Sequence, residues 1–123
     1  MSDLLTQPIE ATTSQRWEAV CPLARILPDT GAAALLHGRQ VAVVRVGEAE
    51  VYALANHDPF SGAMVIARGL VGDRGGIAVI ASPLYKQAFA LRTGQCLDDP
   101  AVALATWPAR IVDGMIEIDT TGL

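Results

Sequence analysis

The sequence predicts an all-β domain, an antiparallel β-sandwich with one loop-rich end. Its 123 residues suit one domain with a core that needs no disulfides. Hydrophobic residues make up 51% of the chain but aromatic residues only 5%, which predicts aliphatic layers between strands. Short apolar runs alternate with turn residues over most of its length. The domain is expected to span residues 15–123, because residues 1–14 show no apolar period and are predicted to form a flexible tail.

Four strands are expected in the first half of the domain. The first, over residues 16–21, alternates apolar and charged side chains and should be half-buried. Apolar runs at 33–36, 40–46 and 50–54 are separated by short turns, which are typical of an antiparallel meander. The run at 40–46 is apolar on nearly both faces, which predicts a central strand. The buried face of the first strand is expected to carry Trp17, Ala19 and Cys21.

A long connection and a hairpin are expected next. Residues 58–76 are rich in Gly and have no clean period, which predicts an extended connection with one helical turn near 63–67. Residues 77–81 and 87–91 are predicted to pair around the turn Ser82–Tyr85, where Pro83 presets one backbone angle.

The last element is predicted to be a hairpin of residues 109–112 and 115–118. Asp113-Gly114 separates these two apolar runs, and Asp-Gly between apolar strands is a strong hairpin signal. Trp107, a large aromatic residue before a proline, is expected to anchor this hairpin in the core. The prediction totals eight to nine strands.

Charge and composition exclude several classes of function. A net charge of −4 and a pI near 4.9 argue against binding to nucleic acid, which requires a basic surface. No apolar stretch approaches the ~20 residues of a membrane-spanning helix, and the N-terminus does not resemble a signal peptide. The two cysteines, Cys21 and Cys96, are therefore expected to be reduced thiols of a cytoplasmic protein.

Basic residues are scattered around the predicted loops. They could make one end of the domain locally basic, or they could be ordinary surface charge. The residues concerned are Arg68, Arg74, Lys86, Arg92 and Arg110.

Two turns have the spacing of a metal-cluster site without its ligands. Rieske domains hold a [2Fe–2S] cluster with Cys-x-His and Cys-x-x-His loops, that is, two thiolates and two imidazoles. The corresponding segments here are Ala55-Asn56-His57 and Ser82-Pro83-Leu84-Tyr85, where only His57 matches. A methyl group does not ligate and a hydroxyl is a poor donor for a soft metal site, so a cluster is expected to be absent.

The residues around these two turns form a recognisable pattern: Asp58-Pro59-Phe60, Arg68–Gly72 and Ala81–Gln87, followed by Phe89, Leu91, Gly94 and Cys96. With this pattern the chain resembles the small subunit of assimilatory NAD(P)H nitrite reductase, a family with a cluster-free Rieske-like fold. The resemblance runs from about Trp17 to Ile118, and the Ser-Pro-Leu-Tyr-Lys-Gln segment carries most of its specificity. His57 departs from the family pattern.

This resemblance implies a non-catalytic subunit of a cytoplasmic enzyme complex that reduces nitrite to ammonium in nitrate assimilation. The large subunit would carry FAD, an iron–sulfur cluster and sirohaem, and this chain would carry none of them. The chain would stabilise or orient the large subunit, or shape electron entry, through its loop-rich end. The candidate docking residues are Asp58, Phe60, Arg68, Tyr85, Lys86 and Gln87.

Other functions are weighed against this one. The chain could be a free-standing Rieske-like interaction module unrelated to nitrite, or a Rieske ferredoxin that serves an oxygenase, although the missing thiolates argue against the second. Together with the two cysteines, His37 and His57 offer zinc-ligand types, but at no structural zinc spacing. His37 is expected to be exposed at a turn, and His57 to bond backbone groups of its loop.

Catalysis by the chain alone has little support in the sequence. Ser82 and Cys96 have no recognisable His-Asp partners, which a catalytic nucleophile requires. Asp98-Asp99 could be paired acids, but beside Pro100 they are expected to solvate a loop.

Overall fold

The computed structural model describes residues 15–123, and the predicted tail of residues 1–14 lies outside the described residues. The described chain is almost entirely antiparallel β-structure, which confirms the all-β prediction. Its strands are β1 (Trp17–Pro22), β2 (Thr30–Leu36), β3 (Arg39–Val46), β4 (Glu50–Ala55), β5 (Leu70–Arg74), β6 (Ile77–Ala81), β7 (Ala88–Ala90), β8 (Thr106–Trp107), β9 (Ala109–Val112) and β10 (Met115–Asp119). Two 3-10 turns, η1 (Leu23–Arg25) and η2 (Ile66–Arg68), complete it.

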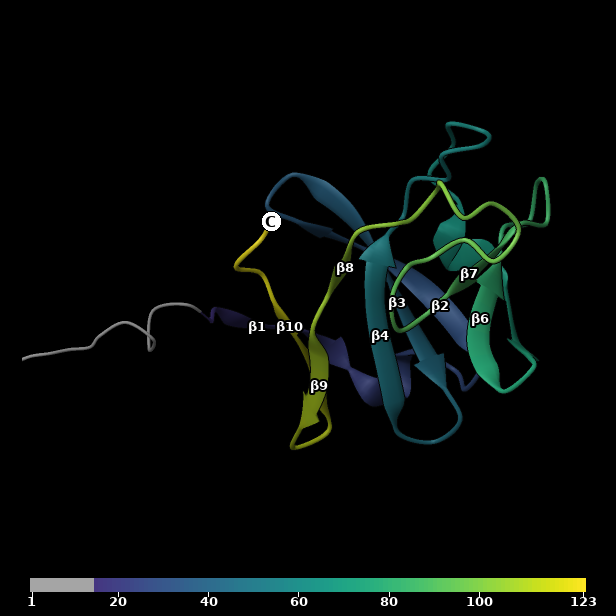
Figure 1. Cartoon of the computed structure of the whole chain (residues 1–123). Coiled ribbons are helices and arrows are strands. Elements are labelled where there is room, and N and C mark those ends of the chain that lie inside the picture. Colours follow the sequence, from purple (N-terminus) through teal and green to yellow (C-terminus); the bar gives the residue numbers. More distant parts are fainter. Residues whose placement is uncertain (1–14) are drawn as a thin grey trace, which may run out of the picture.

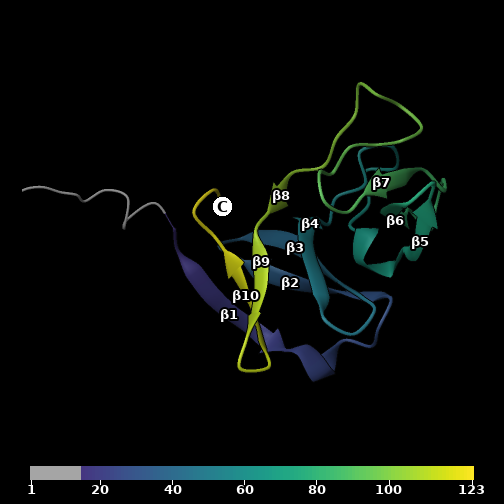
Figure 2. The ribbon, with the colours of Figure 1, turned by 60° about the horizontal axis from the view of Figure 1, so that its bottom comes forward.

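Three sheets make up the sandwich. The central sheet has the order β2-β3-β4-β8. The sheet β1-β10-β9 lies on one side of it, and the sheet β5-β6-β7 lies toward the other side (Figures 1 and 2). Neither of the helical turns in residues 15–123 is long or apolar enough to cross a membrane.

The predicted central strand, β3, contributes to two separate cores. It pairs with β2 and β4, and its side chains alternate between two faces, as a pleated strand requires. Because both faces are buried, β3 is apolar throughout its middle. The loop-side core contains Ala42, Val44, Leu54, Ile66, Ala67, Ile80, Phe89, Leu91, Cys96 and Leu104, and the terminal-side core contains Ile26, Val41, Val43, Ala53, Trp107, Ile116 and Ile118.

Two-residue turns with positive φ angles close three of the hairpins. Such turns match the twist of antiparallel strands and favour Gly or Asp at their centre. Asp113-Gly114, with φ angles of 50° and 78°, joins β9 to β10 as predicted. His37-Gly38 joins β2 to β3 in the same way, and Gly75-Gly76 joins β5 to β6. The prediction of a strandless connection over residues 58–76 was therefore wrong in its second half, where β5 forms.

The first strand also differs from its prediction. The pairing of β1 with β10 shifts register between Ala19 and Cys21. This irregularity changes which side chains face inward. Ala19 is exposed, whereas Val20 and Cys21 pack against the terminal-side core. Trp107 lies in that core, as expected for an anchor of the final hairpin.

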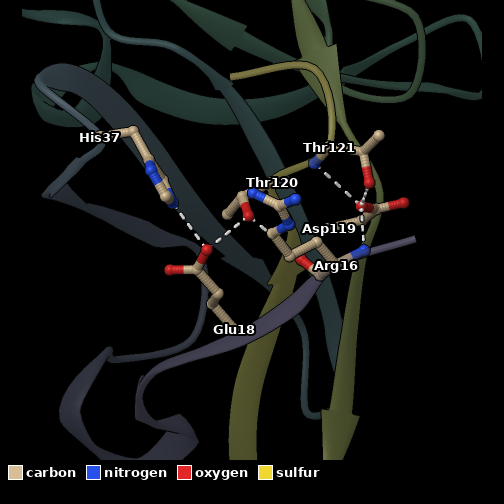
Figure 3. Close-up of polar contacts among 6 residues, drawn as sticks. All are labelled: Arg16, Glu18, His37, Asp119, Thr120 and Thr121. Carbon is tan, nitrogen blue, oxygen red and sulfur yellow. Dashed lines mark hydrogen bonds and ion pairs between the residues drawn. The ribbon is translucent and has the colours of Figure 1, made fainter. Parts of the chain in front are cut away.

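The start of β1 and the end of β10 are joined by polar contacts (Figure 3). The Asp119 carboxylate accepts hydrogen bonds from the Arg16 amide at 3.0 Å and from the Thr121 hydroxyl. The Glu18 carboxylate lies 2.6 Å from both the Thr120 hydroxyl and the His37 imidazole. His37 is exposed at its turn, as predicted, and its hydrogen bond with Glu18 ties the turn to β1.

Candidate functional site

Two loops form the loop-rich end of the domain. The first loop (residues 55–63) leaves β4, and the second loop (residues 82–87) joins β6 to β7. A buried hydrogen bond from the Ser82 hydroxyl to Asp58 brings the loops side by side. We call these two segments, together with the turn η2, the two-loop end.

Asp58 is the centre of the first loop. Its side chain is fully buried, although an aspartate is seldom buried without partners. Its Oδ1 accepts the Phe60 amide at 2.9 Å, while Oδ2 accepts the Ser61 hydroxyl at 3.0 Å and the Ser82 hydroxyl at 2.6 Å. Asp58 thus caps this turn through its carboxylate, and its hydrogen-bond partners account for its burial.

The carboxylate of Asp58 is held in its charged form. Burial acts to raise its pKa, but hydrogen bonds from the Ser82 hydroxyl, the Phe60 amide and the Ser61 hydroxyl outweigh burial. The net result is a pKa below the ordinary value of 3.8. Asp58 is therefore an anion that organises the loop.

Asn56 ties the first loop to η2. It is 2% exposed, its Oδ1 accepts the Ala67 amide at 2.8 Å, and its Nδ2 donates to Gln40 Oε1 at 3.0 Å. Sequence reasoning missed this residue. The available signal was a polar amide directly after an apolar strand, a common place for side-chain bonds to the backbone.

The second loop is a tight turn with an exposed tip. The Ser82 amide donates to the Gln87 carbonyl, and the Lys86 amide donates to the Ser82 carbonyl. Lys86 adopts a left-handed conformation with φ of 68°, which is uncommon for a residue other than Gly, Asn or Asp. Leu84 and Tyr85 are exposed by 50% and 61%, which is high for side chains of their size.

The six candidate docking residues fall into two groups. Tyr85, Lys86 and Arg68 are exposed at the two-loop end. The other three belong to the fold: Asp58 is buried, Phe60 packs on Phe89 with ring centroids 6.2 Å apart, and Gln87 is half-buried. Gln87 Oε1 is buried without a hydrogen-bond partner in the described part of the chain.

Arg68 is held next to the second loop by close backbone packing. Gly69 follows it, and a Cβ atom there would lie 2.3 Å from the Ala81 carbonyl oxygen. Only glycine allows such an approach. Ala81 precedes Ser82, so the constraint places the end of η2 beside the second loop.

The side chains at the positions that match the ligand spacing of a Rieske domain do not fit a [2Fe–2S] cluster. Ala55 offers a methyl group, and the buried Ser82 hydroxyl is engaged with Asp58. Tyr85 is a phenol at the exposed tip. No three His, Cys, Asp or Glu side chains within residues 15–123 are grouped to hold a metal ion.

His57 does not behave as expected from its sequence. Its side chain is exposed, and among the described residues its imidazole has no hydrogen-bond partner. The prediction that it bonds backbone groups of its loop was wrong, because neighbouring residues already bind these groups. Asp58 binds the Phe60 amide, and Asn56 binds the Ala67 amide.

Two of the five scattered basic residues pair with carboxylates. Arg74 pairs with Asp98 at 2.9 Å, and Arg110 pairs with Glu117 at 2.8 Å on the β9–β10 hairpin. Asp98 also accepts the Ala88 amide, so it ties two segments together rather than only solvating its loop. Arg68 and Lys86 remain as the cations of the two-loop end, and no carboxylate in residues 15–123 pairs with either.

The chain is similar in sequence and in fold to known proteins. The model of the Rieske-like [2Fe-2S] domain matches residues 16–119. The NADH nitrite reductase small subunit of Salmonella typhimurium is 39% identical over 104 residues, covering 84% of this chain and 96% of that protein. The crystal structure of a Mycobacterium tuberculosis candidate for the NADH-dependent nitrite reductase small subunit is 48% identical, with a TM-score of 0.81 and coverage of 85% and 94%.

A large subunit also matches. The NAD(P)H nitrite reductase large subunit of Klebsiella oxytoca is 42% identical over 106 residues. These residues cover 86% of this chain but only 11% of that protein. A domain similar to this chain is thus part of a large subunit in one organism and a separate polypeptide in another.

Proposed function

This chain belongs to the Rieske-like family of nitrite reductase small subunits, and we propose that it is the cluster-free, non-catalytic subunit of an NAD(P)H nitrite reductase. In this role it supports a large catalytic subunit that reduces nitrite to ammonium. The large subunit, not this chain, carries FAD, an iron–sulfur cluster and sirohaem.

The Klebsiella oxytoca match is the observation that carries this proposal. There, one polypeptide contains both the large subunit and a domain 42% identical to this chain. In a fused polypeptide, the two parts belong to one assembly. Each part is also held at a high effective concentration near the other. The separate chain is therefore proposed to bind the large subunit through a surface of its own.

The chemistry of the two-loop end supports the cluster-free part of the proposal. Ala55 and Ser82 stand where thiolates would be needed, and the Ser82 hydroxyl donates a hydrogen bond to the Asp58 carboxylate. Electron transfer within the complex is then left to the cofactors of the large subunit. This chain acts by binding and by orienting its partner.

The exposed tip is the proposed docking surface. Tyr85 and Leu84 provide apolar area, and Arg68 and Lys86 provide positive charge beside it. Tyr and Arg are enriched at protein interfaces, especially among the residues that contribute most to binding. Asp58, Phe60 and Gln87, which are buried or half-buried, support this surface.

We further propose a cytoplasmic location and a role in nitrate assimilation. Both thiols in the chain are free, and Cys96 is buried in the loop-side core. Unpaired cysteines suit a reducing compartment. Burial also acts to raise the pKa of the Cys21 thiol, which lowers its reactivity.

Co-expression with the large subunit from the same genome tests the proposal. The tagged small subunit should co-purify with the large subunit, and nitrite-dependent NAD(P)H oxidation should fall when the small subunit is omitted. The control is the large subunit alone, with its cofactor content measured. A large subunit that is fully active alone and does not bind this chain would instead favour a free-standing interaction module.

A further inference from the structure

We propose that the hydrogen bond between Ser82 and Asp58 is the crosslink that positions the exposed tip for docking, taking the place that a metal cluster has in a Rieske protein. The inference rests on the proposed function. It assigns Asp58 and Ser82 as positioning residues, since neither side chain is exposed to a partner.

Each loop is closed by its own hydrogen bonds. In the first, the Gly62 amide donates to the Asp58 carbonyl and the Asp58 amide donates to the Ala63 carbonyl. In the second, Ser82 exchanges backbone bonds with Lys86 and Gln87. Within residues 15–123, the hydrogen bond that joins one loop to the other is the one from Ser82 Oγ to Asp58 Oδ2.

Burial and charge make this bond strong. The two residues are 1% and 0% exposed, and the oxygen–oxygen distance is 2.6 Å. Hydrogen bonds from a hydroxyl to a carboxylate are short and stronger than those between neutral groups. In a buried site they are strengthened further, and breaking one leaves an unpaired polar group away from water.

The same hydroxyl reaches toward the tip. Ser82 Oγ accepts a hydrogen bond from the Leu84 amide at 3.3 Å while it donates to Asp58. Leu84 directly precedes Tyr85, the most exposed aromatic residue of the tip. A path of hydrogen bonds therefore runs from the buried carboxylate through Ser82 to the docking residues.

The position of Ser82 is the reason why its hydrogen bond to Asp58 can be compared with a metal cluster. In a Rieske protein, ligands from both loops bind one [2Fe–2S] cluster, which fixes the loops relative to each other. Here the residue at a thiolate-spaced position, Ser82, instead bonds a residue of the opposite loop. Asp58 lies one position beyond His57, which points to solvent.

The experiment compares two single hydroxyl deletions in the full chain. Ser82→Ala removes the bond between the loops, whereas the control Ser61→Ala removes a hydroxyl that bonds the same oxygen from within the first loop. Amide hydrogen exchange of the isolated chain is read at Phe60 and Lys86, one amide in each loop. Ser82→Ala should speed exchange at both by about tenfold, roughly the effect of one lost hydrogen bond. Ser61→Ala should leave Lys86 unchanged.

Asp58→Asn provides a second variant. If the bond is the crosslink, adding Ser82→Ala in the Asp58→Asn background should change exchange at Lys86 less than it does in the native chain. Equal effects in both backgrounds would overturn the inference. So would unchanged exchange at Phe60 in Ser82→Ala, with circular dichroism confirming that the variant is folded.

Affinity for the large subunit separates the inference from the proposed function. Ser82→Ala should weaken binding about tenfold in parallel with its exchange effect, and Ser61→Ala should not. If Tyr85→Ala weakens the complex but Ser82→Ala does not, the positioning role is overturned and the docking surface stands. If the chain does not bind the large subunit at all, the proposed function fails, and the exchange data still decide whether the crosslink exists.

Discussion

At the scale of single residues, Tyr85 is the exposed aromatic side chain of the proposed docking surface. It exposes 61% of its surface at a turn that is otherwise tightly closed. A large aromatic ring gains little from this position in water, but it gains much when buried in an interface. Its neighbour Leu84 is also half-exposed, so the tip presents a small apolar surface.

Tyr85→Ala is expected to weaken the complex with the large subunit by about 2 kcal/mol or more, the typical contribution of a central aromatic anchor. Binding would be measured by titration calorimetry, with the melting temperature of the free chain as a control. Leu27→Ala provides a matched control, because Leu27 is 71% exposed on another part of the domain. Equal affinities for the native chain and Tyr85→Ala would place the interface elsewhere.

Lys86→Glu is expected to act mainly on the association rate and its salt dependence. An exposed charge at the rim steers encounter more than it holds the complex. The measurement is the association rate at several ionic strengths. Lys86→Gln is the comparison variant. It removes the positive charge without adding a negative one, and like Lys86→Glu it keeps a non-Gly residue at a φ of 68°. Similar rates for Lys86→Glu and the native chain at low salt would contradict a steering role.

The purified chain is expected to contain no stoichiometric iron or labile sulfide. Restoring the ligand spacing with Ala55→Cys, Ser82→Cys and Tyr85→His, which together with His57 complete the set, should recover only partial cluster binding. Ser82→Cys also removes the hydroxyl that bonds Asp58, and hydrogen bonds around a cluster would still be missing. Iron and sulfide assays of both proteins test this. Iron and labile sulfide in amounts that correspond to one cluster per native chain would contradict this expectation.

The residues of the site were predicted unevenly from sequence. The turn at Ser82–Tyr85 was predicted from local turn chemistry, and Tyr85 lies exposed on it. The hydrogen bond between Asp58 and Ser82 could not be predicted, because it joins residues 24 positions apart that only the folded chain brings together. Phe60 illustrates the same limit: its contact with Phe89 makes it part of the core, so Phe60→Ala is expected to destabilise the domain.

At the scale of elements, patterns with local causes were predicted well. The β2–β3–β4 meander and the β9–β10 hairpin have clear apolar runs and turn residues, and both are confirmed. β8 was missed because it has only two residues. β5 was missed because its four flanking or internal glycines obscured the apolar pattern, although Gly75-Gly76 is itself a hairpin signal.

Acid is expected to loosen the contact between β1 and its neighbours. The Thr120 hydroxyl, followed by His37, lowers the pKa of Glu18 from its ordinary value of 4.5 (Figure 3). A carboxylate with a lowered folded-state pKa stabilises the fold above its unfolded-state pKa. That contribution is lost as the pH falls from 4.5 through the folded-state value. Asp119, whose pKa is lowered by bonds from Thr121 and Arg16, acts in the same direction.

Urea unfolding at a series of pH values from neutral to about 3 measures this effect. Glu18→Gln should make the free energy of unfolding depend less on pH below 4.5 than in the native chain. Glu48→Gln is the control, because its side chain is 94% exposed and lies at a different turn. A native-like pH dependence in Glu18→Gln would show that the Glu18 contacts contribute no stability.

At the scale of the whole molecule, one strand couples the two cores. Val44 faces the loop-side core and Val43 faces the terminal-side core, and both belong to β3. Neither core can lose its packing without exposing one face of this strand. The proposed docking surface, built on the loop-side core, is therefore expected to share the stability of the entire domain.

Two core substitutions test this coupling. Ile80→Ala in the loop-side core and Ile116→Ala in the terminal-side core each delete a fully buried side chain, and each should cost about 2–5 kcal/mol. If the domain unfolds as one unit, tryptophan fluorescence and far-ultraviolet circular dichroism should give the same midpoint in each variant.

The positions of the two tryptophans allow fluorescence to report on the terminal-side core alone. Trp107 is in the terminal-side core and Trp17 is on β1, so fluorescence reports on the side of the molecule far from Ile80. Cooperative unfolding requires Ile80→Ala to lower the fluorescence midpoint as much as the circular dichroism midpoint. A fluorescence midpoint that stays at the native value would mean that the loop-side core unfolds separately. The two-loop end could then change its structure on docking while the terminal-side core stays intact.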